Sequence, residues 1–255
     1  MDMISALILG AVQGLTEFLP VSSTAHLIIV PTVFHLPEPS VAFDVLLHLG
    51  TVCAVLVYFS KDIWQILTKE QKYIWLIVLA SIPTAFMGFF LKDFFESFFQ
   101  SLLWVGFFLI ITGCILWVAE KYTKAKKSLK EFGWFDALII GIGQGVAILP
   151  GISRSGTTIS VALGRGINRD IAARFSFLLS VPAILGAGLL KAKEITTIDI
   201  LPGLIGFTAA MLTGLVAIKL FMGLIQKHKI SYFSWYCWIV GILIILGVSF
   251  AAFSY

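Results

Sequence analysis

A cluster of polar side chains interrupts an apolar stretch near the start of the chain. Its members are an amide, an acid, three hydroxyls and a histidine: Gln13, Glu17, Ser22, Ser23, Thr24 and His26. Gln13 and Glu17 are four residues apart, so on a helix they share one face. Pro20 ends that helix, and the hydroxyl residues after it can cap the next one. Because a helix N-terminus attracts phosphate and His26 can move a proton near neutral pH, the cluster indicates phosphate chemistry.

A second polar turn, LPGISRSGTT, occupies residues 149–158. Gly151 lets the backbone approach a ligand closely, and Arg154 carries a planar fork of donors that matches phosphate oxygens. Further hydroxyl groups for the same anion are those of Ser153, Ser155 and Thr158. An anion held between a hydroxyl nucleophile, an imidazole and a guanidinium is typical of phosphoryl transfer.

The segments around both turns are too apolar for a soluble protein. Of the 255 residues, 59% are hydrophobic and 13% are charged, with a mean hydropathy of +0.99. Soluble domains average about 25% charged residues, so the chain is predicted to be a polytopic membrane protein. A charge at bilayer depth costs roughly 2.5–3.5 kcal/mol, which makes Glu17 and His26 functional candidates. Asp44, His48 and Arg174, early in apolar runs, are expected to have structural roles at interfaces.

Six apolar runs are each close to the roughly 20 residues that a helix needs to cross a bilayer. They are residues 41–60, 73–91, 101–119, 172–190, 200–220 and 232–253. Residues 1–34 and 134–164 differ, because each holds an apolar stretch, a polar turn and a second stretch too short to span comfortably. We expect these two to be re-entrant helical hairpins that enter and leave by the same face. The predicted fold is all-α, with about ten helical segments.

The sequence repeats at a constant offset of 131 residues. ALILGAVQG at 6–14 and ALIIGIGQG at 137–145 agree at six of nine positions. The same offset pairs Ser22 with Ser153, Ile28 with Ile159, Val30 with Val161, Leu47 with Leu178 and Trp104 with Trp235. Such a shift, held from end to end, indicates two related halves.

The halves, residues 1–124 and 132–255, are predicted to form a single membrane domain joined by a basic linker, residues 120–133. Each half would have three spanning helices, so the second half must lie inverted relative to the first. In inverted-topology repeats, the interrupted segments meet near the midplane and build the site. The two polar turns should therefore face each other.

Lysine and arginine residues gather on one side of this topology. The side that holds the linker receives most of them, whereas the side of the N-terminus receives Lys92, Lys191 and Lys193. The positive-inside rule then places the linker in the cytoplasm. Both termini and the opening of the active site are predicted to be extracytoplasmic.

Together, the motifs QGLTEFLPVSSTAH and LPGISRSGTT resemble those of the undecaprenyl-diphosphatase family, the bacitracin-resistance type of integral membrane phosphatase. The resemblance covers essentially the whole chain. It implies an enzyme of the bacterial plasma membrane that hydrolyses undecaprenyl diphosphate to undecaprenyl phosphate and so recycles the carrier lipid of cell-wall synthesis. It also implies a divalent cation, Mg²⁺ or Ca²⁺. Because Gln13 occupies the first acidic position, Glu17 is the expected metal ligand, aided by an amide oxygen and the diphosphate itself.

The residues and the resemblance together suggest a role for each side chain. We expect Ser23 to attack the terminal phosphorus, with His26 as general base and later acid. Arg154 would hold the phosphoryl oxygens, while Glu17 and the cation neutralise the diphosphate. The other residues expected to bind substrate are Gln13, Ser22, Thr24, Gly151, Ser153, Ser155 and Thr158. Water in place of Ser23 is the alternative nucleophile.

A transporter or lipid flippase is the alternative function, because inverted repeats are common among transporters. The difference between the halves favours an enzyme, since Ile148 and Thr157 stand at the positions that correspond to Glu17 and His26. The net charge of +4 comes without a basic stripe interleaved with aromatic residues, so nucleic acid is not an expected partner. Membrane lipid is the expected surrounding, and the sequence leaves a homodimer as an option.

Overall fold

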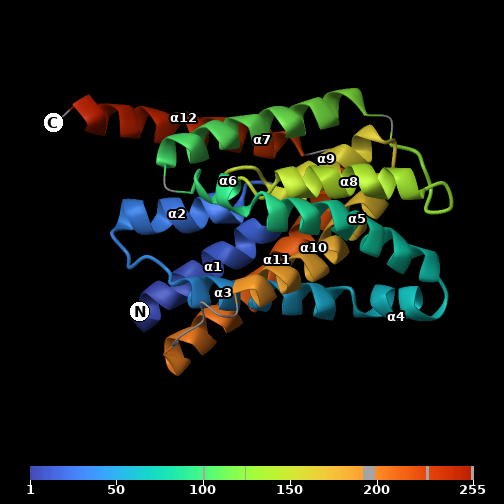
Figure 1. The fold of residues 1–255 in the computed structure, drawn as a ribbon, viewed down its shortest axis with the longest axis horizontal. Helices are drawn as coiled ribbons and strands as arrows, with labels where there is room; N and C mark the ends of the chain where they lie inside the picture. The colour runs from blue at the N-terminus through green and yellow to red at the C-terminus, as the bar shows by residue number, and fades with distance from the viewer. Residues whose placement is uncertain (100, 124, 192–198, 228–229, 254–255) are drawn as a thin grey trace.

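The computed structural model describes residues 1–99, 101–123, 125–191, 199–227 and 230–253, and this part of the chain folds into twelve α-helices (Figure 1). They are α1 (Met3–Phe18), α2 (Ser23–Phe34), α3 (Val41–Tyr58), α4 (Ser60–Thr68), α5 (Gln71–Phe90), α6 (Lys92–Glu96), α7 (Leu102–Tyr122), α8 (Trp134–Val146), α9 (Arg154–Gly164), α10 (Arg169–Lys191), α11 (Ile200–Gln226) and α12 (Ser231–Phe253). The described residues contain no β-strand, only an isolated bridge between Lys127 and Ile167.

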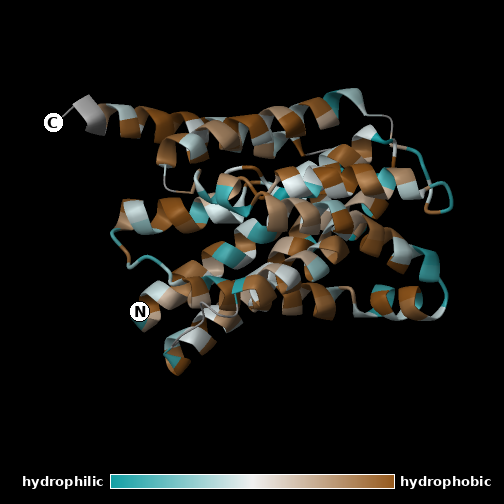
Figure 2. Cartoon of the chain, in the orientation of Figure 1, coloured by the Kyte–Doolittle hydropathy of each residue, from teal (hydrophilic) through white to brown (hydrophobic). Residues whose placement is uncertain are grey.

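Six of these helices are long and apolar enough to cross a membrane, namely α3, α5, α7, α10, α11 and α12. Hydrophobic residues predominate along these helices (Figure 2), and many of their large side chains are exposed. Trp75, Leu243 and Phe250, for example, are 71%, 63% and 71% exposed. Apolar exposure on this scale marks a surface that faces lipid rather than water. The predicted all-α membrane fold is confirmed.

Two of the twelve helices are not among the roughly ten helical segments that the sequence predicts. The first, α4, follows α3 after Phe59, a residue that ends one helix and precedes the next. The second, α6, has five residues. Both are too short to be recognised as spans by their apolar length. In addition, α7 continues to Tyr122, three residues into the predicted linker, where the Lys121 ammonium lies 4.4 Å from the Trp117 ring centroid. A cation in the last turn favours this extension, because it meets the negative end of the helix dipole.

Glycines at matching positions in the two repeat motifs let helices pack backbone to backbone. A Cβ on Gly10 of α1 would lie 2.3 Å from the carbonyl oxygen of Gly206 in α11. A Cβ on Gly141 of α8 would lie 2.1 Å from the carbonyl oxygen of Ala80 in α5. Neither gap admits a methyl group, so only glycine permits these approaches. The glycines of the repeated motif thus allow α1 to pack closely against α11, and α8 against α5.

Each short hairpin is therefore seated on a long helix from the other half of the chain. The helices α7 and α12 also pack against each other, and α3 packs against α11 as α10 does against α5. Figure 1 shows the start of α1 and the end of α12 at the same end of the molecule, with α4 at the opposite end. The inverted repeat and the orientation of the halves in a membrane stay predictions.

Candidate functional site

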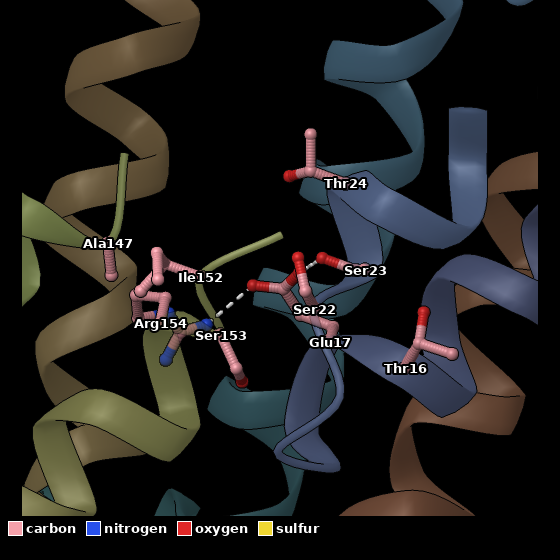
Figure 3. A pocket seen from close by; sticks show the side chains of 9 residues that line it. All are labelled: Thr16, Glu17, Ser22, Ser23, Thr24, Ala147, Ile152, Ser153 and Arg154. Carbon is pink, nitrogen blue, oxygen red and sulfur yellow. Dashed lines mark hydrogen bonds and ion pairs between the residues drawn. The ribbon is translucent and has the colours of Figure 1, made fainter. Parts of the chain in front are cut away.

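The two polar turns lie against each other and enclose a small cavity (Figure 3). The residues that line it come from both turns: Thr16, Glu17, Ser22, Ser23, Thr24, Ala147, Ile152, Ser153 and Arg154. Its volume is about 30 Å³. That volume suits a water molecule, so a phosphate group can enter only if side chains that line the cavity move.

Glu17 lines the cavity and is 7% exposed. Its Oε1 accepts from Nη2 of Arg154 at 2.5 Å, and its Oε2 accepts from Oγ of Ser23 at 2.6 Å (Figure 3). Nε2 of Gln13 donates to the same Oε2 at 3.0 Å. Because Glu17 belongs to α1 and Arg154 begins α9, this ion pair joins the two halves of the chain.

The turn before Ser23 has an unusual backbone. Ser22 has a φ of 66°, a conformation that L-residues other than glycine rarely adopt. Its Oγ accepts weakly from the backbone N–H of Ala25, 3.4 Å away, and its carbonyl oxygen lies 2.8 Å from Nδ1 of His26. Such strain, on the order of 1–3 kcal/mol, persists only where neighbouring contacts hold it. The strained turn directs the hydroxyl of Ser23 to Glu17.

The second turn depends on Gly151 and on a threonine from α7. Gly151 has a φ of +105°, and a Cβ there would lie 2.5 Å from the carbonyl oxygen of Val105. Oγ1 of Thr112 donates to the carbonyl of Gly151 at 2.8 Å and accepts from the backbone N–H of Ser153 at 3.0 Å. Thr112 was not among the residues predicted for the site, because its only signal in the sequence is a hydroxyl inside an apolar run.

Two helix N-termini meet at the cavity. Ser23 is the first residue of α2 and Arg154 the first of α9, and both line the cavity. Their N-caps, Ser22 and Ser153, are 131 residues apart and so correspond in the repeat. The first N–H groups of each helix have no partner within it, and the helix dipole adds partial positive charge. This geometry suits an anion.

The ring of His26 contacts Ser22 and Tyr236 rather than Ser23. Its Nδ1 lies 2.8 Å from the carbonyl oxygen of Ser22, and its Nε2 lies 2.6 Å from the hydroxyl of Tyr236. The reason is local, because His26 stands one helical turn after Ser22 and its ring reaches back to that carbonyl. The hydrogen bond from Ser23 that the sequence assigned to His26 goes to Glu17 instead.

The residues expected to bind substrate fall into two groups. Ser22, Thr24 and Ser153 line the cavity. The other four do not line it but make hydrogen bonds that hold the lining residues or the turns in place: Gln13, Gly151, Ser155 and Thr158. Oγ of Ser155 donates to the carbonyl of Leu19 at 3.3 Å and so ties the two turns together. Oγ1 of Thr158 lies 2.6 Å from Oγ of Ser176 and fastens α9 to α10.

Two further side chains of the site were not among the sequence candidates. Thr16 lines the cavity. His48, expected to be structural, places Nε2 3.8 Å from Oε2 of Glu17, while its Nδ1 lies 2.8 Å from the carbonyl oxygen of Asp44. Nothing in the linear pattern relates a histidine in the middle of α3 to a glutamate in α1.

The cavity offers a divalent cation some oxygen ligands but no complete shell. Glu17 is its only carboxylate, and the described ranges hold no group of three or more His, Cys, Asp or Glu side chains that could bind a metal ion. Oε1 of Gln13, however, is buried and has no hydrogen-bond partner. A carboxylate beside an unpartnered amide oxygen suits Mg²⁺ or Ca²⁺, which prefer oxygen and take further ligands from substrate phosphates.

Comparison with known proteins identifies the family of this chain over nearly its whole length. Residues 6–243 match the model of a protein family described as bacitracin resistance protein BacA. A protein named undecaprenyl-diphosphatase from Carboxydothermus hydrogenoformans is 47% identical over 254 residues, covering 96% of this chain and 97% of the relative. Relatives of the same name from Methanosphaera stadtmanae and Halothermothrix orenii are 41% and 43% identical, each covering 96% of this chain and 98% of the relative. The resemblance drawn from the two motifs is confirmed, and the chain belongs to the BacA family of bacitracin resistance proteins.

Proposed function

We propose that the cavity between the two turns hydrolyses undecaprenyl diphosphate to undecaprenyl phosphate and inorganic phosphate. The chain is a membrane hydrolase of the kind its relatives are named for. One observation carries the assignment to this cavity: the carboxylate of Glu17 accepts hydrogen bonds from both a hydroxyl and a guanidinium where two helix N-termini meet.

Arg154 is the group that receives the terminal phosphate. Nη2 donates to Glu17, and Nη1 donates to the carbonyl of Ser176 at 3.2 Å. A guanidinium has five N–H donors, so three remain for phosphate oxygens once these two bonds are made. These two bonds fix the plane of the guanidinium, and the remaining donors bind the phosphate oxygens.

Ser23 is the nucleophile. Its Oγ forms a bond to the terminal phosphorus as its proton passes to Oε2 of Glu17, which lies 2.6 Å away. The bond from that phosphorus to the bridging oxygen breaks, and undecaprenyl phosphate leaves with the electron pair. Water then attacks the phosphorus of the phosphoserine, the bond from phosphorus to Oγ of Ser23 breaks, Glu17 returns its proton to that oxygen, and inorganic phosphate departs. Glu17 thus takes the role of base first expected of His26, whose two ring nitrogens have other partners.

A divalent cation, Mg²⁺ or Ca²⁺, would be held by Glu17 and Oε1 of Gln13 together with the diphosphate. When bound, it would neutralise part of the charge of the diphosphate. With a single carboxylate in the cavity, the protein alone should bind the cation weakly.

Purified protein in detergent tests the reaction, because detergent leaves no second compartment to which a lipid could be moved. We expect one phosphate released per undecaprenyl diphosphate, with loss of activity in a chelator and recovery on adding Mg²⁺ or Ca²⁺. A protein that releases no phosphate but moves the lipid between the leaflets of a vesicle would support the flippase instead.

We further propose that the protein lies in the bacterial plasma membrane with both termini outside. The asymmetry of lysine and arginine supports this orientation. In a background without the native cysteines, Met3→Cys should react with an impermeant thiol reagent in intact cells, whereas Lys126→Cys should react only after lysis. Both side chains are exposed in the structure, so labelling reports the side of the membrane. The reverse pattern would invert the topology.

A further inference from the structure

We propose that Tyr236 is a positioning residue for the reaction, acting through His26 to hold the turn that presents Ser23. The inference rests on the proposed function of Ser23. Tyr236 belongs to α12 in the second half of the chain, and His26 belongs to α2 in the first. Tyr236 does not line the cavity, so its effect on the reaction must be transmitted by the histidine.

The hydrogen bonds of His26 identify its neutral tautomer. The carbonyl oxygen of Ser22 can only accept, so Nδ1, 2.8 Å away, carries the hydrogen. In the neutral ring Nε2 is then the acceptor, and the hydroxyl of Tyr236 donates to it across 2.6 Å. The two rings also stack, with centroids 5.7 Å apart and planes 13° apart. The carbonyl of Ser22 thus fixes the tautomer of the imidazole, and Tyr236 fixes its plane.

This fixed imidazole supports the strained residue of the turn. Ser22 has a φ of 66°, and its carbonyl oxygen accepts from Nδ1 of His26. If the ring turned away, that carbonyl would keep only the long bond of 3.3 Å from the backbone N–H of His26. The next residue is Ser23, whose placement against Glu17 depends on the turn. The hydrogen-bonded chain thus runs from Tyr236 through His26 to Ser22, which the backbone joins to Ser23.

The second turn is also held by a side chain from a neighbouring long helix, and this parallel supports the role proposed for Tyr236 at the first turn. Thr112 of α7 bonds to both Gly151 and Ser153 of that turn. The helices α7 and α12 correspond at the offset of 131 residues and pack against each other. Each turn is therefore braced from one member of this pair. The braces differ in residue type, since Val105 stands at the position that corresponds to Tyr236.

The first test is the steady-state kinetics of Tyr236→Phe in the full-length protein. Phenylalanine keeps the stacked ring and removes only the hydroxyl. We expect kcat to fall about tenfold, the size of one lost hydrogen bond in a semi-buried network, while KM stays within twofold. KM is spared because Tyr236 lies outside the cavity. Tyr122→Phe is the matched control, because Tyr122 is exposed at the end of α7 and makes ring contacts with Trp117 and Lys121 that phenylalanine keeps.

A double variant shows whether Tyr236 acts through His26. His26→Ala should lower kcat at least as much as Tyr236→Phe, and adding Tyr236→Phe to His26→Ala should cause no further loss. Losses that multiply would show that Tyr236 acts independently of the histidine, and the proposal would be wrong. A wild-type kcat in Tyr236→Phe would overturn it as well.

The ¹⁵N spectrum of histidine-labelled protein tests the geometry without any turnover. The chain has four histidines, so assignment by single substitution is practical. We expect the signals of His26 to report hydrogen on Nδ1, and its Nε2 signal to shift in Tyr236→Phe but not in Tyr122→Phe. An unchanged Nε2 signal would refute the hydrogen bond. If the wild type released no phosphate, the function proposed for Ser23 would fail, and the spectrum would still decide whether Tyr236 fixes His26.

Discussion

Ser23→Ala should abolish the release of phosphate from undecaprenyl diphosphate, with a loss in kcat of at least about 10⁴-fold. A nucleophile and the group that takes its proton act as one unit, so removing either costs nearly the whole of the covalent route. Ser23 donates to Glu17 at 2.6 Å, and the cavity is lined on that side by its hydroxyl. The measurement is steady-state phosphate release by purified variants that elute as wild type on gel filtration.

Ser22→Ala is the matched control for this variant. The hydroxyl of Ser22 makes a long bond of 3.4 Å to the backbone N–H of Ala25 and none to Glu17. Because this hydroxyl caps the N-terminus of α2, its removal should lower the free energy of unfolding by about 1 kcal/mol. The variant should still show measurable turnover. If Ser23→Ala kept near-native turnover, water would be the nucleophile and the phosphoserine would not form.

Arg154→Lys should be nearly as damaging as Arg154→Ala, with kcat lower by roughly 10²–10³-fold. The guanidinium of Arg154 bonds to Glu17 and to the carbonyl of Ser176 through two different nitrogens. Lysine is a single ammonium on a flexible stem, so it cannot keep both bonds and also present parallel donors to phosphate. The donors stabilise the developing charge at phosphorus more than the resting diphosphate, so the loss should appear mainly in kcat.

Arg165→Lys controls for the change in residue type. Arg165 pairs with Asp136 at 2.7 Å on the side of the linker, away from the residues that line the cavity. This variant should retain wild-type kinetics. An Arg154→Lys enzyme within threefold of wild type would mean that the arginine supplies only long-range charge, and the phosphate clamp would have to be sought elsewhere.

Much of the architecture could be predicted because it depends on properties that are local in sequence. A bilayer-spanning helix requires an apolar run of a certain length, so all six spans were found. The repeat placed glycine at Gly10 and Gly141, where backbones meet. The short helices α4 and α6 were not found, because five to nine residues carry no span-length signal.

The site could be predicted only as far as the two turns. Glu17, Ser23 and Arg154 were identified because polar groups are costly in an apolar segment, and the structure brings them into contact. The partners of His26 could not be predicted, since Tyr236 lies 210 residues away and the competing carbonyl of Ser22 depends on a backbone angle. Thr112 and His48 were missed for the same reason, because their contacts arise from helix packing and not from spacing along the chain.

The seating of each hairpin on a helix of the other half also sets an order of assembly during synthesis. When α8 leaves the ribosome, its seat α5 has already been made, whereas α1 must wait until the end of α11 at residue 226. At about 5–20 residues per second, the roughly 200 residues between them take on the order of 10–40 s. During this interval α1 and α2, each shorter than a span, can pack against each other and α1 against α3, but α1 lacks α11, on which it packs most extensively. The polar pocket therefore forms late, and a nascent chain released before α11 is complete holds every residue that lines the pocket without the helix that positions α1.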